Sequence, residues 1–344
     1  MPVLPPLHKK ILTALLLPAL LLFTCLHCHA QKRLSVPVIF DTDMGPDYDD
    51  VGAIALLHAM ADSGECTILA TIASNQHPYI AAVLNTLNTY FKRPDIPVGV
   101  PGGNAVNVSA IQKWDSLLVA NYPHTIQSNG QAQDALQLYR KILAAAPDKS
   151  ITIVTVGFFT NMANLLQSGP DAFSPKNGRA LIKQKVKLLV SMAGRFDHQM
   201  GSFREFNVMK DAPASVITFN TWPTPIIFSG FEIGAALFTG LPIVNNSSIS
   251  HSPVKDVFAH SIPLDPNDKN GRMSWDETAV LVAVRGWLPY FTVEKGQITP
   301  SADGSNGWDK NGKRDYYLVQ KMPLEQITEV INRLIMHKPA NTSN

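Results

Sequence analysis

Charged residues are scarce in this sequence, because only 16% of its 344 residues are Asp, Glu, Lys or Arg. The 29 basic side chains nearly balance the 27 acidic ones, and the first 30 residues hold two lysines and no acid, so the rest of the chain is formally neutral. A neutral body offers no basic surface for the phosphates of DNA or RNA. We therefore expect a small-molecule partner and no nucleic-acid partner.

Cysteines and some familiar hydrolase motifs are also missing. Of three cysteines only Cys66 lies beyond residue 30, so the body of the chain has no internal disulfide framework. No Gly-x-Ser-x-Gly segment occurs, which leaves a serine hydrolase of that type without support. No fixed-period repeat or low-complexity linker divides the chain, and 45% of its residues are hydrophobic. We expect one folded domain over residues 31–344, long enough to bury a sizeable core.

The first 30 residues have the pattern of a secretory signal peptide. Two lysines precede an apolar run over residues 11–23, and Ala30 ends the segment. A basic start, a short apolar run and a small exit residue are typical of a cleaved leader, and the run is short for a membrane span. The sequence predicts cleavage after Ala30, a secreted or periplasmic protein, and no membrane partner after leader removal. Lipid attachment at Cys25 is the alternative.

Short β-rich runs alternate with helical patterns along the rest of the chain. Strands are predicted at residues 36–40, 66–73, 97–100, 151–156, 186–192 and 225–228. Helices are predicted at residues 49–61, 78–91, 131–146, 161–167, 233–238, 278–284 and 324–334. This alternation predicts an α/β fold with a mostly parallel open sheet flanked by helices on both faces. The polar stretch over residues 245–270 is predicted to be a long surface loop.

The first predicted strand runs into a loop that holds five aspartates: Asp41, Asp43, Asp47, Asp49 and Asp50. Open α/β sheets bind ligands at the carboxyl ends of their strands. Crowded carboxylates resist ionising together, and a hard divalent cation relieves their repulsion. The alternative is a solvated loop in which the last two acids cap the following helix. Capping leaves the first two unexplained, so the sequence favours a metal site, with Gly45 permitting the tight turn.

The segment Asp41-Thr42-Asp43-Met44-Gly45, followed by Asp49-Asp50, resembles the N-terminal signature of the inosine–uridine-preferring nucleoside hydrolases. That family usually shows Asp-x-Asp-Pro-Gly-x-Asp-Asp. Here Met44 replaces the proline and two extra residues separate the glycine from the acid pair, as in a secreted, divergent branch. Either Asp47 or Asp49 could therefore match the first member of the pair, and Asp49 is preferred because it lies next to the predicted helix.

Later segments match the same family in the same order. They are Asn75 after the second strand, the run from Gly157 to Asn161, Glu205-Phe206-Asn207, and Trp275-Asp276. This ordered series is more specific than the acidic loop alone. One departure is clear, because Trp275 stands where the family has a histidine near the leaving base.

The resemblance implies a calcium-dependent hydrolase that cleaves the N-glycosidic bond of ribonucleosides. The implied Ca²⁺ ligands are Asp43, Asp50, the Val156 carbonyl and Asp276, with Asp43 also the general base. The implied substrate contacts are Asp49, Asn75, Glu205, Asn207 and Trp275. No leaving-group acid is identified, although His260 is the preferred histidine, and the sequence leaves a homo-oligomer open.

Two other functions compete with this one. A phosphatase of the haloacid dehalogenase class also begins with Asp-x-Asp after a strand, but Gly45 stands where that class usually has threonine. A non-catalytic secreted protein that binds nucleosides or sugars would keep the calcium pocket, and the replaced histidine favours it. Ser274 and Glu277 also have the spacing of a capping box at the start of a helix.

Overall fold

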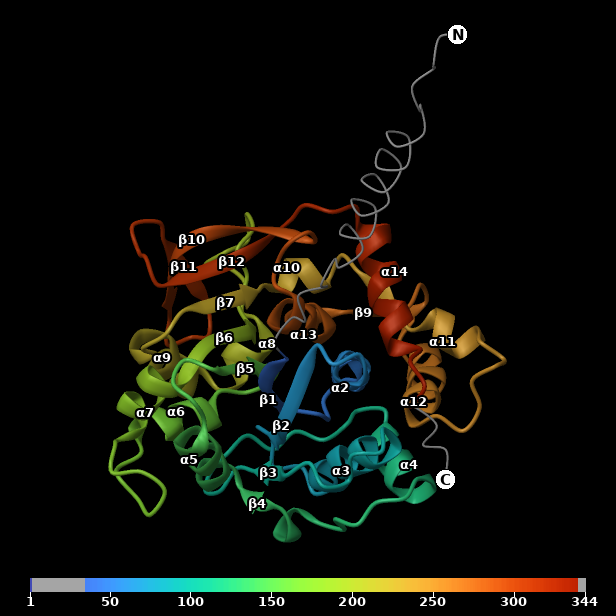
Figure 1. Ribbon diagram of the computed structural model, residues 1–344, viewed down its shortest axis with the longest axis horizontal. Helices are drawn as coiled ribbons and strands as arrows, with labels where there is room; N and C mark the ends of the chain where they lie inside the picture. The colour runs from blue at the N-terminus through green and yellow to red at the C-terminus, as the bar shows by residue number, and fades with distance from the viewer. Residues whose placement is uncertain (2–34, 340–344) are drawn as a thin grey trace. The chain divides into compact units, whose positions relative to one another are not determined.

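The computed structural model describes residue 1 and residues 35–339, and residues 35–339 are built on one ten-stranded sheet (Figure 1). The strand order is β11-β10-β12-β7-β6-β5-β1-β2-β3-β4. The strands are β1 Val36–Thr42, β2 Cys66–Ala73, β3 Val98–Val100, β4 Gln133–Asp134, β5 Ile151–Thr155, β6 Val186–Met192, β7 Ile226–Ser229, β10 Phe291–Pro300, β11 Asn306–Asp309 and β12 Asp315–Gln320. A separate two-stranded ladder joins β8 Phe238–Thr239 to β9 Arg272–Met273.

The sheet is parallel from β12 to β4, and β10 runs antiparallel to both of its neighbours, β11 and β12. This confirms the predicted α/β class. β1 lies in the middle, with Asp41 opposite Ile72 of β2 and opposite Thr155 of β5. The acidic loop that follows β1 therefore starts at the centre of the sheet, at the carboxyl ends of the parallel strands.

Helices cover both faces of the sheet (Figure 1). One face packs against α2, α3, α13 and α14, and the other against α5, α6, α7 and α9. The helices are α2 Asp49–Asp62, α3 Ile80–Tyr90, α4 Trp114–Asn121, α5 Ala135–Ala145, α6 Thr160–Gln167, α7 Gly178–Lys185, α8 Phe206–Lys210, α9 Ala212–Thr221, α10 Phe231–Gly234, α11 Leu241–Asn245, α12 Pro253–Ser261, α13 Trp275–Arg285 and α14 Leu324–Ile335. Three short 3₁₀ turns complete the described elements, at Asn129–Gln131, Ile262–Leu264 and Pro266–Asp268.

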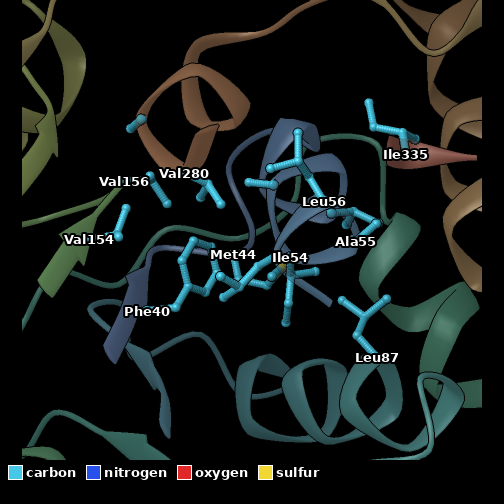
Figure 2. Packing of buried hydrophobic residues seen from close by; sticks show 14 of the residues in the cluster. Phe40, Met44, Ile54, Ala55, Leu56, Leu87, Val154, Val156, Val280 and Ile335 are labelled. Carbon is cyan, nitrogen blue, oxygen red and sulfur yellow. The ribbon is translucent and has the colours of Figure 1, made fainter. Parts of the chain in front are cut away.

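The core on the α2 face reaches up to the acidic loop. Figure 2 shows Phe40 and Met44 packed beside Ile54, with Val156 and Val280 close by. Each of these side chains is at most 1% exposed. The backbone that carries the aspartates is thus anchored from below by apolar packing, which fixes where their carboxylates lie.

The stretch over residues 245–270 is not the surface loop that the sequence suggested. It contains α12, whose Val254, Val257 and Phe258 are almost fully buried. Ser252 caps this helix by accepting a hydrogen bond from the amide of Lys255, and Pro253 occupies its first turn. The sequence contains these capping residues and the i, i+3, i+4 apolar spacing of a helix. The prediction of a loop gave more weight to the polar composition of the segment.

The predicted signal peptide lies outside the described residues. Within residues 35–339, no helix combines the length and apolar character needed to cross a bilayer.

Candidate active site

A cavity of about 230 Å³ lies at the carboxyl ends of the central strands. Its polar lining consists of Asp43, Asp47, Asp49, Glu205, Asn207, Arg272 and Asp276. Its apolar lining consists of Val156, Met192, Phe206, Phe231 and Trp275. Segments separated by more than 200 residues therefore converge on one hollow that holds five carboxyl groups.

Asp43 is held at the floor of the cavity by its neighbours. The carboxyl ends of β2 and β5 bracket β1, because Ser74 donates its amide to Thr42 O (2.8 Å) and Val156 donates its amide to Asp41 O (2.8 Å). Gly157 lies so close that a Cβ there would come 2.7 Å from the Cβ of Asp43. Asn75 Nδ2 donates to Asp43 O at 3.0 Å and to Val108 O at 2.7 Å. The Asp43 backbone is thus fixed on both sides.

The turn of the acidic loop differs from expectation at Gly45. The left-handed residue is Met44, with φ of 25°, whereas Gly45 does not have a positive φ. A Cβ on Gly45 would lie 3.2 Å from Asn75 Nδ2, so the glycine serves the close approach of Asn75 instead. Proline cannot adopt the backbone of Met44, which explains why proline is absent at this position.

Asp50 is fully buried behind the cavity. Its Oδ1 accepts hydrogen bonds from the Thr42 hydroxyl and from the Met44 amide, while Oδ2 has no partner among the described residues. Asp49 and Asp50 lie in the first turn of α2 and do not cap it by side-chain hydrogen bonds. The capping alternative therefore does not account for this pair.

The acidic side chains raise one another's pKa. Burial raises the pKa of Asp43 well above its usual value, and repulsion from Asp50 adds to the effect. Burial also raises the pKa of Asp50 and of Asp276, with repulsion from Asp49 and other loop acids contributing to both. Such a group of carboxylates is under electrostatic strain that a cation would relieve.

The oxygen donors of the site suit a hard cation, although they do not surround a single point in this structure. Asp43, Asp50, Asp276 and the Val156 carbonyl offer oxygen only, and Asp50 Oδ2 is buried without a partner in the described chain. Within residues 35–339, no three acidic, histidine or cysteine side chains converge as a finished metal site. The Val156 carbonyl also accepts a 3.3 Å hydrogen bond from Asn207 Nδ2.

Asp49 is engaged on both of its carboxylate oxygens. Oδ1 accepts from Arg272 Nε at 3.0 Å and Nη2 at 2.8 Å, and Oδ2 accepts from the backbone amides of Trp275 and Asp276 at 3.2 and 3.4 Å. Asp49 therefore caps α13 from another part of the chain. The capping box expected within α13 is wrong, because Ser274 makes no capping bond and instead pairs with the Thr239 hydroxyl at 2.6 Å.

Glu205 and Asn207 face the cavity from the start of α8. Glu205 caps this helix, accepting from the amides of Asn207 (2.9 Å) and Val208 (3.1 Å), and it also accepts from Gly194 (3.2 Å). Burial raises the pKa of Glu205 to about 7. Asn207 donates through Nδ2 to the carbonyls of Val156 and Met192, which leaves its Oδ1 as an acceptor for a ligand.

Aromatic rings form one wall of the cavity. Trp275 and Phe231 lie 5.2 Å apart between ring centroids, and the Trp275 indole donates its N–H to the Phe231 carbonyl at 2.8 Å. Phe206 is 37% exposed and lies at the opening. The ring planes of Trp275 and Phe231 are tilted by 35°, and aromatic faces of this kind suit contact with a planar heterocycle.

Three of the residues selected from sequence do not line the cavity: Asp50, which is buried behind it, Asn75 and His260. Asn75 has its amide group fully engaged with backbone, because its Oδ1 also accepts from the amides of His77 and Val108. His260 lies on α12 with Nε2 2.9 Å from Gln112 O. Among the described residues, no histidine lines this cavity.

Comparison with known proteins identifies the family. A model described as "Inosine-uridine preferring nucleoside hydrolase" matches residues 38–314. This chain belongs to that family. The phosphatase alternative is thereby removed, and the predicted resemblance is confirmed.

Individual relatives are more distant. The pyrimidine-specific ribonucleoside hydrolase RihA of Salmonella enteritidis is 31% identical over 217 residues, a match that covers 58% of this chain and 61% of that protein. The chain thus spans about 61% of the length of the curated relatives it matches.

Solved structures with the same fold are also found. The inosine-uridine preferring nucleoside hydrolase from Bacillus anthracis aligns with a TM-score of 0.65 at 16% identity, covering 88% of this chain and 99% of that chain. The type III effector protein XopQ, solved in complex with adenosine diphosphate ribose, aligns with a TM-score of 0.66 at 14% identity, covering 95% and 99%. At these identities the likeness establishes the fold.

The structure of this family member adds residues that the sequence did not single out. Arg272, Phe206, Phe231 and Met192 all line the cavity. Arg272 is a lone arginine outside any motif, and only its spacing of three residues before Trp275 could have drawn attention to it.

Proposed function

We propose that this protein hydrolyses the N-glycosidic bond of ribonucleosides to a free base and ribose, and that it depends on calcium. The observation that carries the proposal is the cavity itself, in which Asp43, Asp276, Glu205 and Asn207 face one hollow beside an aromatic wall. The name of the Salmonella relative, a pyrimidine-specific ribonucleoside hydrolase, supports a nucleoside substrate.

The calcium ion would be held by Asp43, Asp50, Asp276 and the carbonyl of Val156. When bound, it supplies a site for the vicinal sugar hydroxyls and lowers the pKa of water. Two features support this choice: the donors are all oxygen, and Asp50 Oδ2 has no hydrogen-bond partner within residues 35–339.

The chain's own residues have separate tasks in the proposed reaction. Asp43 accepts the proton of the attacking water, which is general-base catalysis. Glu205 and the free Oδ1 of Asn207 accept hydrogen bonds from sugar hydroxyls and orient the ring. The buried carboxylates stabilise the positive charge that develops on the sugar carbon. Phe206, Phe231 and Trp275 cover the base and exclude water.

The proposal is tested by incubating the purified protein with a panel of ribonucleosides in calcium-containing buffer and measuring free reducing sugar. We expect release from at least one nucleoside, and a chelator should abolish it. Binding of nucleosides, detected as thermal stabilisation, with no sugar release would contradict the enzymatic function.

Asp43→Asn is expected to lower kcat by about 10²–10⁴-fold, because an amide cannot accept the proton of water. Asp148→Asn is the matched control, since the Asp148 side chain is 60% exposed and pairs with Lys185 outside the cavity. Near-normal turnover of Asp43→Asn would remove Asp43 from the chemistry.

We also propose export of the protein, on the leader pattern of the first 30 residues. Mass spectrometry of protein made in a secreting host should find Gln31 as the first residue. An intact N-terminus starting at Met1 would contradict this.

A further inference from the structure

The leaving base lacks an evident partner in this site. The histidine expected beside it is replaced by Trp275, whose only N–H donor is already bonded to the Phe231 carbonyl. No histidine lines the cavity within the described residues. Departure of a nitrogen base leaves negative charge on the base, and that charge needs stabilisation.

Arg272 is the only cationic side chain that lines the cavity in the described part of the chain. Its guanidinium is fixed on one edge by Asp49 and Asp47, which accept hydrogen bonds from Nε and Nη2. The group also lies 5.0 Å from the ring centroids of both Tyr48 and Trp275. Such a group is preorganised, because neither its charge nor its position changes during a reaction.

One nitrogen of Arg272, Nη1, makes no hydrogen bond within residues 35–339 and has only a long ion pair with the buried Asp268. The carboxylate of Asp268 is 3.7 Å away, and the other Arg272 nitrogens make the hydrogen bonds to Asp47 and Asp49. An N–H donor of this kind gains most from an acceptor supplied by a bound molecule.

The position of Arg272 in the cavity suits contact with a leaving base. The floor of the cavity carries the proposed sugar contacts, with Asp43, Glu205 and Asp276 between 2 and 4% exposed. The opening carries Phe206 at 37% and the Asp47 side chain at 44%. The Arg272 side chain is 7% exposed, close to the floor residues, and Arg272 also lines a second cavity of about 310 Å³. In the proposed binding mode the sugar lies on the floor and the base faces the wall that carries Arg272.

We propose that Arg272 is the catalytic residue that stabilises the departing base, through hydrogen bonding from Nη1 and fixed positive charge. This inference rests on the proposed nucleoside hydrolase function and replaces proton donation by a histidine. The bond between the anomeric carbon and the base nitrogen breaks, and its electron pair goes to the base. The water oxygen bonds to the carbon, its proton passes to Asp43, and the base takes a proton from solvent.

The experiment compares two kinds of riboside in calcium-containing buffer. Uridine and inosine have poor leaving groups, whereas 4-nitrophenyl riboside releases a stable anion that needs no assistance. Arg272→Met should lower kcat/KM for the nucleosides by about 100-fold or more, while hydrolysis of the aryl riboside changes by less than about fivefold. Arg272→Lys keeps a cation and should recover at least about tenfold of the lost nucleoside activity.

The aryl riboside separates this role from a structural one. Equal losses on both kinds of substrate in both variants would overturn the proposal, because Arg272 would then act by holding Asp49 and the sugar side of the site. Wild-type protein that cleaves neither substrate would instead refute the hydrolase function. If Arg272→Met fails to fold, Arg272→Lys alone tests the proposal. A loss of kcat/KM on nucleosides but not on the aryl riboside supports it. An equal loss on both kinds of substrate overturns it.

Arg195→Met is the matched control. Arg195 lies 5.1 Å from the Phe231 ring centroid and pairs with Asp197, yet it does not line the cavity. We expect its ratio of nucleoside to aryl riboside activity to equal that of the wild type. A ratio that falls as far as in Arg272→Met would show that loss of any nearby cation suffices, and would overturn the assignment.

Discussion

Gly157 allows the end of β5 to lie directly against Asp43. Its hypothetical Cβ would come 2.6 Å from Ser74 Oγ and 2.7 Å from Asp43 Cβ, so an alanine there must push the floor of the cavity apart. Glycine is therefore required here for the close approach of the two backbones. A larger residue should also displace the Asp43 carboxylate, which the proposed reaction uses.

Gly157→Ala is expected to lower the free energy of unfolding by about 1–3 kcal/mol, because it overpacks a buried contact. It should also reduce kcat by displacing Asp43. Gly169→Ala is the control, since nothing lies within 4 Å of its hypothetical Cβ; it should change stability by less than about 0.5 kcal/mol. Urea unfolding and nucleoside turnover measure both variants, and equal stability of the two would contradict the argument.

Single site residues were predictable where their position after a strand, or at the start of a helix, indicated a place at the carboxyl end of the sheet. Asp43, Glu205, Asn207 and Asp276 each follow a strand or open a helix, and all four line one cavity. Asn75 was selected by the same logic, but its side chain braces the backbone of Asp43. Arg272 could not be found in this way, because its partners Asp47 and Asp49 lie more than 220 residues away in the sequence.

Helix α13 takes its N-terminal cap from a remote element. Ser274 and Glu277 have the right spacing for a local capping box, yet the amides of Trp275 and Asp276 are bonded by Asp49 of α2. Local spacing cannot reveal this, because the competing acceptor is brought in by tertiary packing. Glu277 is left fully buried with no hydrogen-bond partner among the described residues.

Asp49→Asn should destabilise the junction of α2 and α13. The Asp49 and Arg272 side chains are 2% and 7% exposed, and breaking such a buried pair costs about 3–5 kcal/mol. Asp47 still faces the guanidinium, so we expect the lower end of that range. Asp47→Asn, at a side chain that is 44% exposed, should cost about 1 kcal/mol or less. Urea unfolding compares the two variants; a larger loss for Asp47→Asn would contradict the assigned cap.

The order of strands and helices was predictable for most of the parallel sheet. The run over residues 66–73 coincides with β2, and the run over residues 186–192 with β6. The last three strands of the sheet, β10, β11 and β12, were not predicted. In β10 and β11, polar and exposed residues such as Glu294, Lys295 and Asp309 interrupt the apolar ones, so no apolar run marks these strands. β12 does contain a short run, Tyr316 to Val319, which the sequence analysis did not select.

At the scale of the whole molecule, calcium binding should be coupled to stability. A ligand that binds only the folded protein stabilises it by about 2.7 kcal/mol at 100 times its Kd. We expect calcium to raise the melting temperature of the wild type, and Asp50→Asn to abolish this response. Asp148→Asn should respond like the wild type. A wild-type melting temperature that is unchanged by millimolar calcium would argue against the cation.

Acid sensitivity should arise partly from His58, which is buried between α2 and α3. Its Nε2 lies 3.0 Å from Asn88 Oδ1, its ring stacks on Phe91, and burial lowers its pKa from 6.5 to about 3. The unfolded chain therefore binds a proton that the folded chain excludes between pH 6.5 and 3. The contribution of neutral His58 to the free energy of unfolding is fully present above pH 6.5. It is lost as the pH falls below 6.5, by up to about 1.4 kcal/mol per pH unit.

This pH dependence can be measured as the difference between wild type and His58→Gln. Glutamine can still donate to Asn88 but does not titrate, so the gap in unfolding free energy between the two proteins should narrow as the pH is lowered from 7 to 5. A constant gap over that interval would show that folding does not lower the pKa of His58.

The pairing of Asp49 with Arg272 across 223 positions has a consequence for biosynthesis. At about 5–20 residues per second, roughly 10–45 s pass between translation of the two residues. During that interval the nascent chain carries a cluster of aspartates before Arg272, their counter-charge, and α13, the helix that Asp49 caps, have been made. The end of the sheet that carries the candidate site can therefore take its final form only late in synthesis, and a fragment that ends before Arg272 keeps an unneutralised acidic patch.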